Sequence, residues 1–258
     1  MAITTEQVKE LREQTGVSVM QCKKALEEAG GDMEKALILL KKKSSEIALK
    51  KADRLASDGT IVSITRDGKI AMLELNCETD FVAKNEDFTN LAVLLSEKLL
   101  ELGSEGLVLV SEELISPVVQ KIGENIKLGK TIVVEGSSIG SYVHNGKMGV
   151  VVSLSGGSGE LAKDIAMHIA AMKPEFISKE EIPAETIAKV EEISKEEIEK
   201  TDKTEDIKKK MLEGKISSYF KEITLLEQSF IKNGDISVGQ LLKNSGANIV
   251  SYEMYRIG

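Results

Sequence analysis

Residues 61–75 read IVSITRDGKIAMLEL, and residues 139–153, which begin 78 positions later, read IGSYVHNGKMGVVVS. In each stretch, apolar and polar residues alternate on either side of a short polar pair, Asp67-Gly68 in the first and Asn145-Gly146 in the second. Asp-Gly and Asn-Gly between alternating runs are typical of the tight turn of a β-hairpin. The sequence therefore predicts the same hairpin twice.

A helical pattern follows each predicted hairpin. Apolar residues recur at helical spacing between Phe88 and Leu99, and again between Leu161 and Ile169. A hairpin followed by a helix can bury one face of its sheet beneath that helix. We therefore expect an α+β fold with a duplicated core, formed by one subdomain at 54–137 and a second at 138–258.

The first fifty residues predict a separate module of three short helices. Thr4 with Gln7 and Ser18 with Gln21 have the spacing of capping boxes, which mark where helices begin. A third helix follows and continues into a lysine-rich stretch with few large apolar residues. We interpret residues 1–53 as a helical module with a solvated linker.

A segment rich in Glu and Lys at about 182–222 predicts an inserted helical hairpin. Apolar residues recur at helical spacing before and after the polar pair Thr201-Asp202, which is typical of two antiparallel helices joined by a turn. Residues 235–242 then predict a strand and a helix. A closing strand at 248–255 could return to the second subdomain.

Composition argues against several classes of function. The net charge of −8 and the pI near 5.1 oppose non-specific attraction to nucleic acid. Cys22 and Cys77 are too few for a disulfide framework and favour reduced thiols. The opening residues do not read as a secretory signal, and no apolar run approaches the roughly 20 residues that span a bilayer. We expect a cytoplasmic protein without a membrane partner.

Enzymatic chemistry finds little support in the residue spacing. Residues 123–131 read GENIKLGKT, with five residues between the glycines where a phosphate-binding loop has four. His144 and His168 lack the spacing of metal ligands, and His168 falls on the apolar face of its helix, where a packed or interface histidine is expected. We expect no catalytic residue, metal, cofactor or small-molecule substrate. A nucleotide-hydrolysing enzyme is the competing hypothesis.

The segment 74–84, ELNCETDFVAK, is the strongest candidate for a functional loop. Strand-like alternation ends at Asn76, so the residues that follow can be presented by a loop. The alternative is that Phe81 fills the core while Asp80 caps the next helix. The usual burial of phenylalanine favours that alternative.

This segment and residues 11–26, LREQTGVSVMQCKKAL, resemble the two sequence signatures of the elongation factor Ts family. The resemblance continues through KIGENI at 121–126, IAMHIAA at 165–171 and KPEF at 173–176, in the family's order. It implies a ubiquitin-associated-like three-helix module, two similar α+β subdomains and a protruding helical hairpin. It also implies a guanine nucleotide exchange factor that releases GDP from elongation factor Tu.

The resemblance further implies which residues contact elongation factor Tu. The loop that enters its GTPase domain and disturbs the magnesium site would consist of Thr79, Asp80, Phe81 and Val82. Ile122 and Gly123 would pack nearby, and the helix that carries His168 would face another domain of the partner. Apolar Val17 and Met20 flank a helix start, where a loop could expose them as further contacts.

Two more expectations accompany the resemblance. A ubiquitin-binding adaptor built on the N-terminal module is a third functional hypothesis, and it would require ubiquitin binding. Some family members carry a further helical module after the closing strand. The sequence to Gly258 has no counterpart of it, which puts any contact made by that module in doubt.

Overall fold

A computed structural model describes residues 3–201 and 203–258. The chain divides into two compact units. Unit 1 contains Met1–Glu135, Val143–Gly149 and Tyr255–Gly258, and unit 2 contains Gly136–Tyr142 and Val150–Met254. The domain boundaries expected near residues 53 and 137 stay predictions.

Unit 1 begins with α1 (Thr5–Thr15), α2 (Val19–Glu28) and α3 (Met33–Lys51). Both predicted capping boxes are formed, because Thr4 and Ser18 each exchange side-chain and backbone hydrogen bonds with the glutamine three residues later. The three helices bury a small apolar core of their own. Its fully or almost fully buried members are Leu11, Val17, Cys22, Ala25, Leu26, Ala36 and Leu40.

The first hairpin pairs β1 (Asp58–Arg66) with β2 (Lys69–Cys77) in antiparallel register. Asp67 and Gly68 have φ angles of 52° and 71°, and a tight hairpin turn of this kind requires positive φ at both positions. A third strand, β3 (Ile126–Glu135), pairs with the other side of β2. The sheet order is therefore β1-β2-β3.

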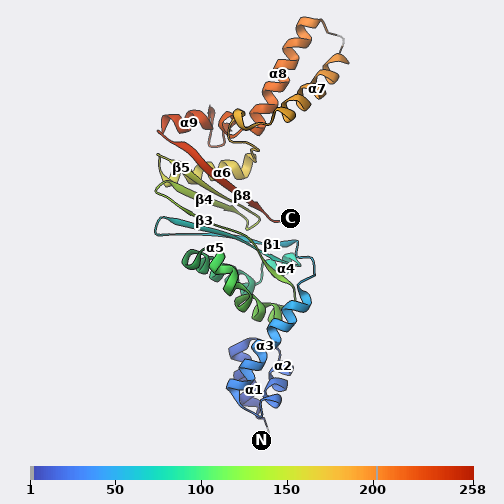
Figure 1. Cartoon of the computed structure of the whole chain (residues 1–258), viewed down its shortest axis with the longest axis vertical. Helices are drawn as coiled ribbons and strands as arrows, with labels where there is room; N and C mark the ends of the chain where they lie inside the picture. The colour runs from blue at the N-terminus through green and yellow to red at the C-terminus, as the bar shows by residue number, and fades with distance from the viewer. Residues whose placement is uncertain (1–2, 202) are drawn as a thin grey trace. The chain divides into compact units, whose positions relative to one another are not determined.

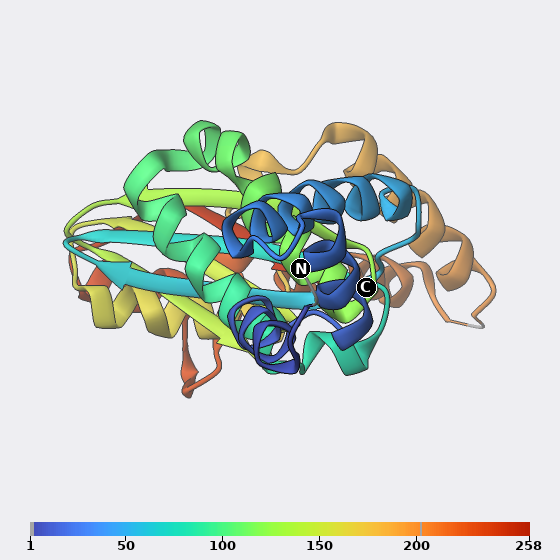
Figure 2. The same cartoon turned by 90° about the horizontal axis from the view of Figure 1, so that it is seen from below.

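Two helices connect β2 to β3. The first is the short α4 (Asp80–Ala83), and the second is the long α5 (Glu86–Ile122), which bends at Gly103, where the backbone is not helical. α5 covers one face of the sheet, as Figure 1 and Figure 2 show from two directions. Phe88, Leu95 and Leu99 of α5 pack in one core cluster with Leu73 and Leu75 of β2.

The second hairpin repeats the first. β4 (Ile139–His144) and β5 (Met148–Ser155) flank Asn145 and Gly146, whose φ angles of 51° and 68° match those of the first turn. The third strand is β8 (Asn248–Arg256), which lies beside β5, so the sheet order is β4-β5-β8. The hairpins predicted from the repeat and the closing strand are confirmed, and so is the α+β fold class.

Helix α6 (Gly159–Met172) lies directly against β4 in unit 2. A Cβ atom on Gly140 would come within 2.2 Å of the backbone nitrogen of Lys163, so only glycine permits this approach. The buried face of α6 carries small and branched apolar residues, which suit such close packing. They are Ala162, Ile165, Ala166, Ile169 and Ala170.

The predicted helical hairpin consists of α7 (Ala184–Glu199) and α8 (Glu205–Ile223), which run side by side in Figure 1. Thr201 belongs to the connection, whereas Asp202 lies outside the described residues. The rest of unit 2 is built from short elements. They are η1 (Lys179–Glu181), η2 (Leu225–Glu227), β6 (Ser229–Phe230), β7 (Asn233–Ser237) and α9 (Val238–Asn244). Within residues 3–201 and 203–258, no helix is both long enough and apolar enough to cross a bilayer.

Candidate partner-binding site

The candidate loop contains a single helical turn that is capped by Thr79. The Thr79 hydroxyl oxygen accepts a hydrogen bond from the Val82 amide at 3.4 Å, which makes Thr79 the N-cap of α4. Asp80 is therefore the first residue of α4. The alternative interpretation, in which Asp80 was the helix cap, is wrong. The Asp80 carboxylate accepts a hydrogen bond from the Lys84 ammonium group at 2.8 Å on the surface.

Phe81 and Val82 point in different directions from this turn. Phe81 is 81% exposed, whereas Val82 is buried in the core cluster beneath the sheet. The interpretation of Phe81 as a core residue is wrong, because the helical turn directs Val82 inward and Phe88 already lies in that core. Val82 is not exposed by the loop in the free chain, and its expected part in the partner contact stays a prediction. Asp80 and Phe81 are the residues that the loop exposes.

A second loop, which follows α5, holds the first loop through Glu124. The Glu124 carboxylate accepts hydrogen bonds from the amides of Glu78 and Thr79, each at 3.1 Å. It also accepts a hydrogen bond from the Thr79 hydroxyl at 2.8 Å. One side chain therefore binds three donors of the loop that carries Phe81.

Glu78 makes the reverse contact. Its carboxylate accepts a hydrogen bond from the backbone amide of Asn125 at 2.7 Å and one from the Arg54 guanidinium group at 3.4 Å. The Asn125 hydrogen bond, followed by the charge of Arg54, lowers the pKa of Glu78 below its ordinary value. The side-chain amide of Asn125 in turn donates to the Arg54 carbonyl at 2.7 Å. The linker after α3 is thereby joined to both loops.

Ile122 and Gly123 stand where α5 ends, next to these contacts. Gly123 has a φ of 89° and closes the helix in the left-handed conformation that favours glycine. Ile122 is half-buried and packs against the cluster that contains Val82. The Gly123 carbonyl accepts a hydrogen bond from Lys51. The structure thus brings both residues to the candidate loop.

Sequence reasoning did not single out Glu78, Glu124 or Asn125 as site residues. Glu78 and Glu124 lie 46 positions apart, and no periodic pattern links them. The only available signal was that both fall inside the segments ELNCETDFVAK and KIGENI, which carry the family resemblance.

A family model described as "Elongation factor TS" matches residues 78–258, which is more than half of the chain. The chain belongs to the elongation factor Ts family. An "Elongation factor Ts" of Hahella chejuensis is 43% identical over 100% of this chain and 92% of its own length. Proteins of the same name from Pseudomonas aeruginosa and Aeromonas hydrophila are 43% and 39% identical, each over 99% of this chain and 91% of their own lengths.

The contact expected at the start of α2 in this member of the elongation factor Ts family needs one correction. Met20 is 75% exposed, but Val17 is only 4% exposed. Val17 directly precedes the N-cap Ser18, and it belongs to the same small core as Cys22, four residues after that cap. Such a hydrophobic staple fixes how the chain enters a helix, so Val17 has a structural role.

The side chain of His168 is fully buried in unit 2, as expected for a packed histidine, and the partner contact expected of its helix stays a prediction. The Ile231 amide donates to its Nδ1 at 3.2 Å, and Nε2 lies 2.9 Å from the Gln228 side-chain oxygen. An acceptor at Nδ1 leaves the proton on Nε2, so the ring is neutral. Burial lowers the pKa of His168, which agrees with that state.

The described residues offer little to the rival enzymatic hypothesis. The segment 123–131, which nearly matches a phosphate-binding loop, follows the helix α5 and leads into the strand β3. A phosphate-binding loop instead follows a strand and precedes a helix, whose N-terminus faces the phosphate. Burial raises the pKa of the Cys77 thiol to about 11, so this cysteine is not a thiolate nucleophile near neutral pH. Within residues 3–201 and 203–258, no group of three or more His, Cys, Asp or Glu side chains is arranged to hold a metal ion.

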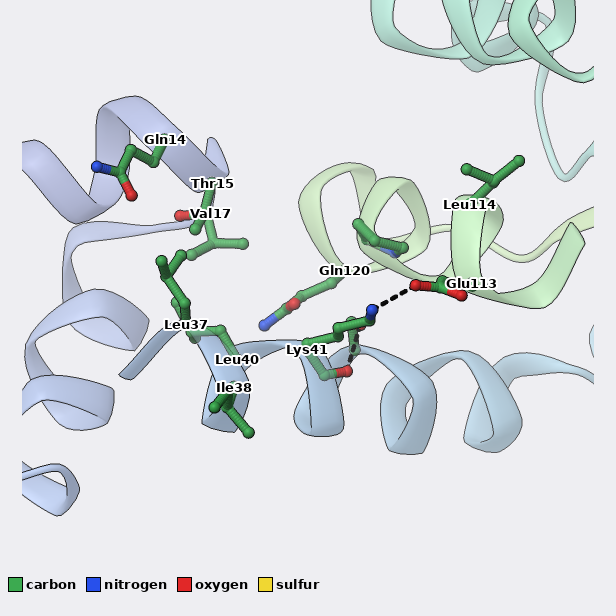
Figure 3. A pocket seen from close by; sticks show the side chains of 12 residues that line it. Gln14, Thr15, Val17, Leu37, Ile38, Leu40, Lys41, Glu113, Leu114 and Gln120 are labelled. Carbon is green, nitrogen blue, oxygen red and sulfur yellow. Dashed lines mark hydrogen bonds and ion pairs between the residues drawn. The ribbon is translucent and has the colours of Figure 1, made fainter. Parts of the chain in front are cut away.

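An open cleft of about 470 Å³ separates α1 and α3 from the C-terminal half of α5, all within unit 1. Its walls are largely apolar, and Figure 3 shows Leu37, Leu40 and Leu114 among them. The Lys41 ammonium group and the Glu113 carboxylate form an ion pair across it. A cleft of this composition has no evident catalytic chemistry, and it lies apart from the loop that exposes Phe81.

Proposed function

We propose that this chain is a guanine nucleotide exchange factor that releases GDP from elongation factor Tu during translation elongation. Membership in the elongation factor Ts family supports the role and the partner. The observation that carries the finer mechanism is the exposure of Phe81 on a short helix whose neighbours are firmly held. In this mechanism, Asp80 and Phe81 enter the GTPase domain and disturb its magnesium site.

The physical chemistry of the two side chains suits this role. A large aromatic ring that is solvent-exposed in the free protein gains its full burial free energy only when it enters a partner. Asp80 brings a carboxylate, a group that attracts Mg²⁺ and repels phosphate, to the same helical turn. Phe81 would therefore provide binding energy, and Asp80 would act on the ion and the nucleotide.

The exchange mechanism requires no covalent step by this chain. If the factor and GDP oppose each other on elongation factor Tu, each weakens the binding of the other by the same free energy. The result is faster GDP release, so the chain is proposed to act as a binding protein and not as an enzyme. Its net charge of −8 agrees with a protein partner and not a nucleic acid. The cytoplasm, where translation occurs, is the proposed compartment.

The decisive experiment measures GDP release from the cognate elongation factor Tu with and without this protein. We expect release to accelerate with protein concentration until it saturates. Binding of the two proteins without acceleration would contradict the proposed function. The protein alone, assayed for GTP hydrolysis and for nucleotide binding, tests the rival enzyme, and we expect neither activity.

A further inference from the structure

We propose that Glu124 is a positioning residue for nucleotide exchange, because it holds the Phe81 loop in its active conformation before the partner arrives. The device is a reciprocal clasp formed by Glu78 and Thr79 on one loop and by Glu124 and Asn125 on the other. This inference rests on the proposed function and names the residues that prepare its site.

The first half of the clasp is a carboxylate that binds successive backbone amides. One oxygen of Glu124 accepts from the amides of both Glu78 and Thr79 at 3.1 Å. Two adjacent N–H groups that converge on one anionic oxygen form an anion-binding concavity. Hydrogen bonds to a charged acceptor are roughly twice as strong as neutral ones. The contact therefore defines the backbone immediately before α4.

The second half makes the clasp reciprocal and joins it to the linker. Glu78 accepts from the Asn125 amide at 2.7 Å, so each loop supplies a carboxylate to the backbone of the other. Asn125 is 3% exposed, and its side chain donates to the Arg54 carbonyl at 2.7 Å. Each carboxylate therefore binds its own set of donors, and the Asn125 side chain also binds the segment that follows α3.

Thr79 connects the clasp to the helix that presents Phe81. Its hydroxyl donates to Glu124 at 2.8 Å and accepts from the Val82 amide at 3.4 Å as the N-cap of α4. Glu124 therefore orients the group that begins the helix. An isolated helix of four residues is not stable in water, so α4 depends on such tertiary contacts. A loop that is already ordered avoids the entropy cost of ordering on binding.

The test is a double-mutant cycle on GDP release from elongation factor Tu. We expect Glu124→Ala to slow stimulated release by roughly 10- to 100-fold in the presence of Phe81, because a misplaced group loses its effect steeply. In a Phe81→Ala background, the same substitution should change the rate little, because coupled residues are not additive. Glu124→Gln keeps an acceptor oxygen and should restore part of the rate. Glu105→Ala, at an exposed position of α5, is the matched control and should leave the rate unchanged.

A structural measurement separates this inference from the proposed function. Hydrogen exchange of the free protein should show faster exchange at the amides of Glu78, Thr79 and Val82 in Glu124→Ala, and no change there in Phe81→Ala. Unaltered protection, or a rate loss that is equal with and without Phe81, would overturn the clasp. If the wild-type protein fails to release GDP, the proposed function fails while hydrogen exchange still tests the clasp. If Glu124→Ala does not fold, the same comparisons apply to Glu124→Gln.

Discussion

Replacing Phe81 by alanine separates the contribution of this side chain to partner binding from its contribution to folding. The ring is 81% exposed in the free protein, so its removal deletes little buried apolar area. Substitutions at such surface positions change the free energy of unfolding by about 0.5 kcal/mol or less. We expect the melting temperature of Phe81→Ala to equal that of the wild type within about 1–2 °C.

The effect on the complex should be much larger. Full burial of a phenylalanine side chain is worth about 1.5–3 kcal/mol, so its loss from a partner pocket weakens the productive complex by roughly 10- to 150-fold. The assay follows release of a fluorescent GDP analogue from elongation factor Tu at increasing concentrations of wild type and variant. The ratio of the two initial slopes gives the loss in free energy directly.

Phe88→Ala supplies the matched control, because Phe88 is a fully buried phenylalanine of the same unit. Its truncation should cost about 3–5 kcal/mol of folding free energy and visibly lower the melting temperature. If Phe81→Ala destabilised the chain like Phe88→Ala, the reasoning from exposure would be refuted. Normal exchange by a fully folded Phe81→Ala variant would refute the insertion mechanism.

Three further predictions concern other parts of the chain. Asp80→Asn removes the charge but keeps the shape, so it should slow GDP release less than Phe81→Ala does, in the same direction; an unchanged rate would remove Asp80 from the mechanism. A chain that begins at Asp53 should bind elongation factor Tu more weakly in a titration. Met20→Gln should reproduce part of that loss in affinity at an unchanged melting temperature. Val17→Ala, in contrast, should lower the melting temperature. Burial keeps the pKa of His168 below its ordinary value of 6.5, so protonation favours the unfolded chain and stability should fall as the pH drops below 6.5. Thermal melts between roughly pH 5 and pH 8 should show a shallower fall for His168→Gln, and an equal fall would mean that other groups cause it.

The elements that could be predicted from sequence are those whose signals are local. A two-residue turn with positive φ needs residues such as Asp-Gly or Asn-Gly, so both hairpins could be located from two short stretches. The capping boxes at Thr4 and Ser18 are equally local, because their partners lie three residues away. The third strand of each sheet has no such local signal for its pairing, because its partner strand is distant in the sequence. β3 follows α5 directly, whereas β8 returns from the end of the chain.

The candidate site was only partly predictable. The segment after β2 could be singled out from sequence, and the structure forms the short helix α4 there, but the pattern did not specify which of its side chains are exposed. The general burial preference of phenylalanine placed Phe81 in the core, whereas the family resemblance placed it in a partner-binding loop, and Phe81 is exposed. Val17 and Val82, which were expected among the partner contacts, are buried, and so is His168, for which packing in the core was one of two expectations. Residue type gives only a preference for burial, and neighbouring residues of one turn can point to opposite sides.

The sequence by itself determined the secondary structure around each turn and cap, the repetition of the hairpin, and the family. These depend on backbone preferences and on contacts over a few residues, which the order of amino acids specifies directly. Only the tertiary structure decided that Phe81 faces solvent and that Glu124 binds the loop before it. Glu124 reaches that loop because β3 pairs beside β2 and returns the end of α5 to the end of β2. Contacts across such a separation arise from strand pairing and core packing, and no local pattern encodes them.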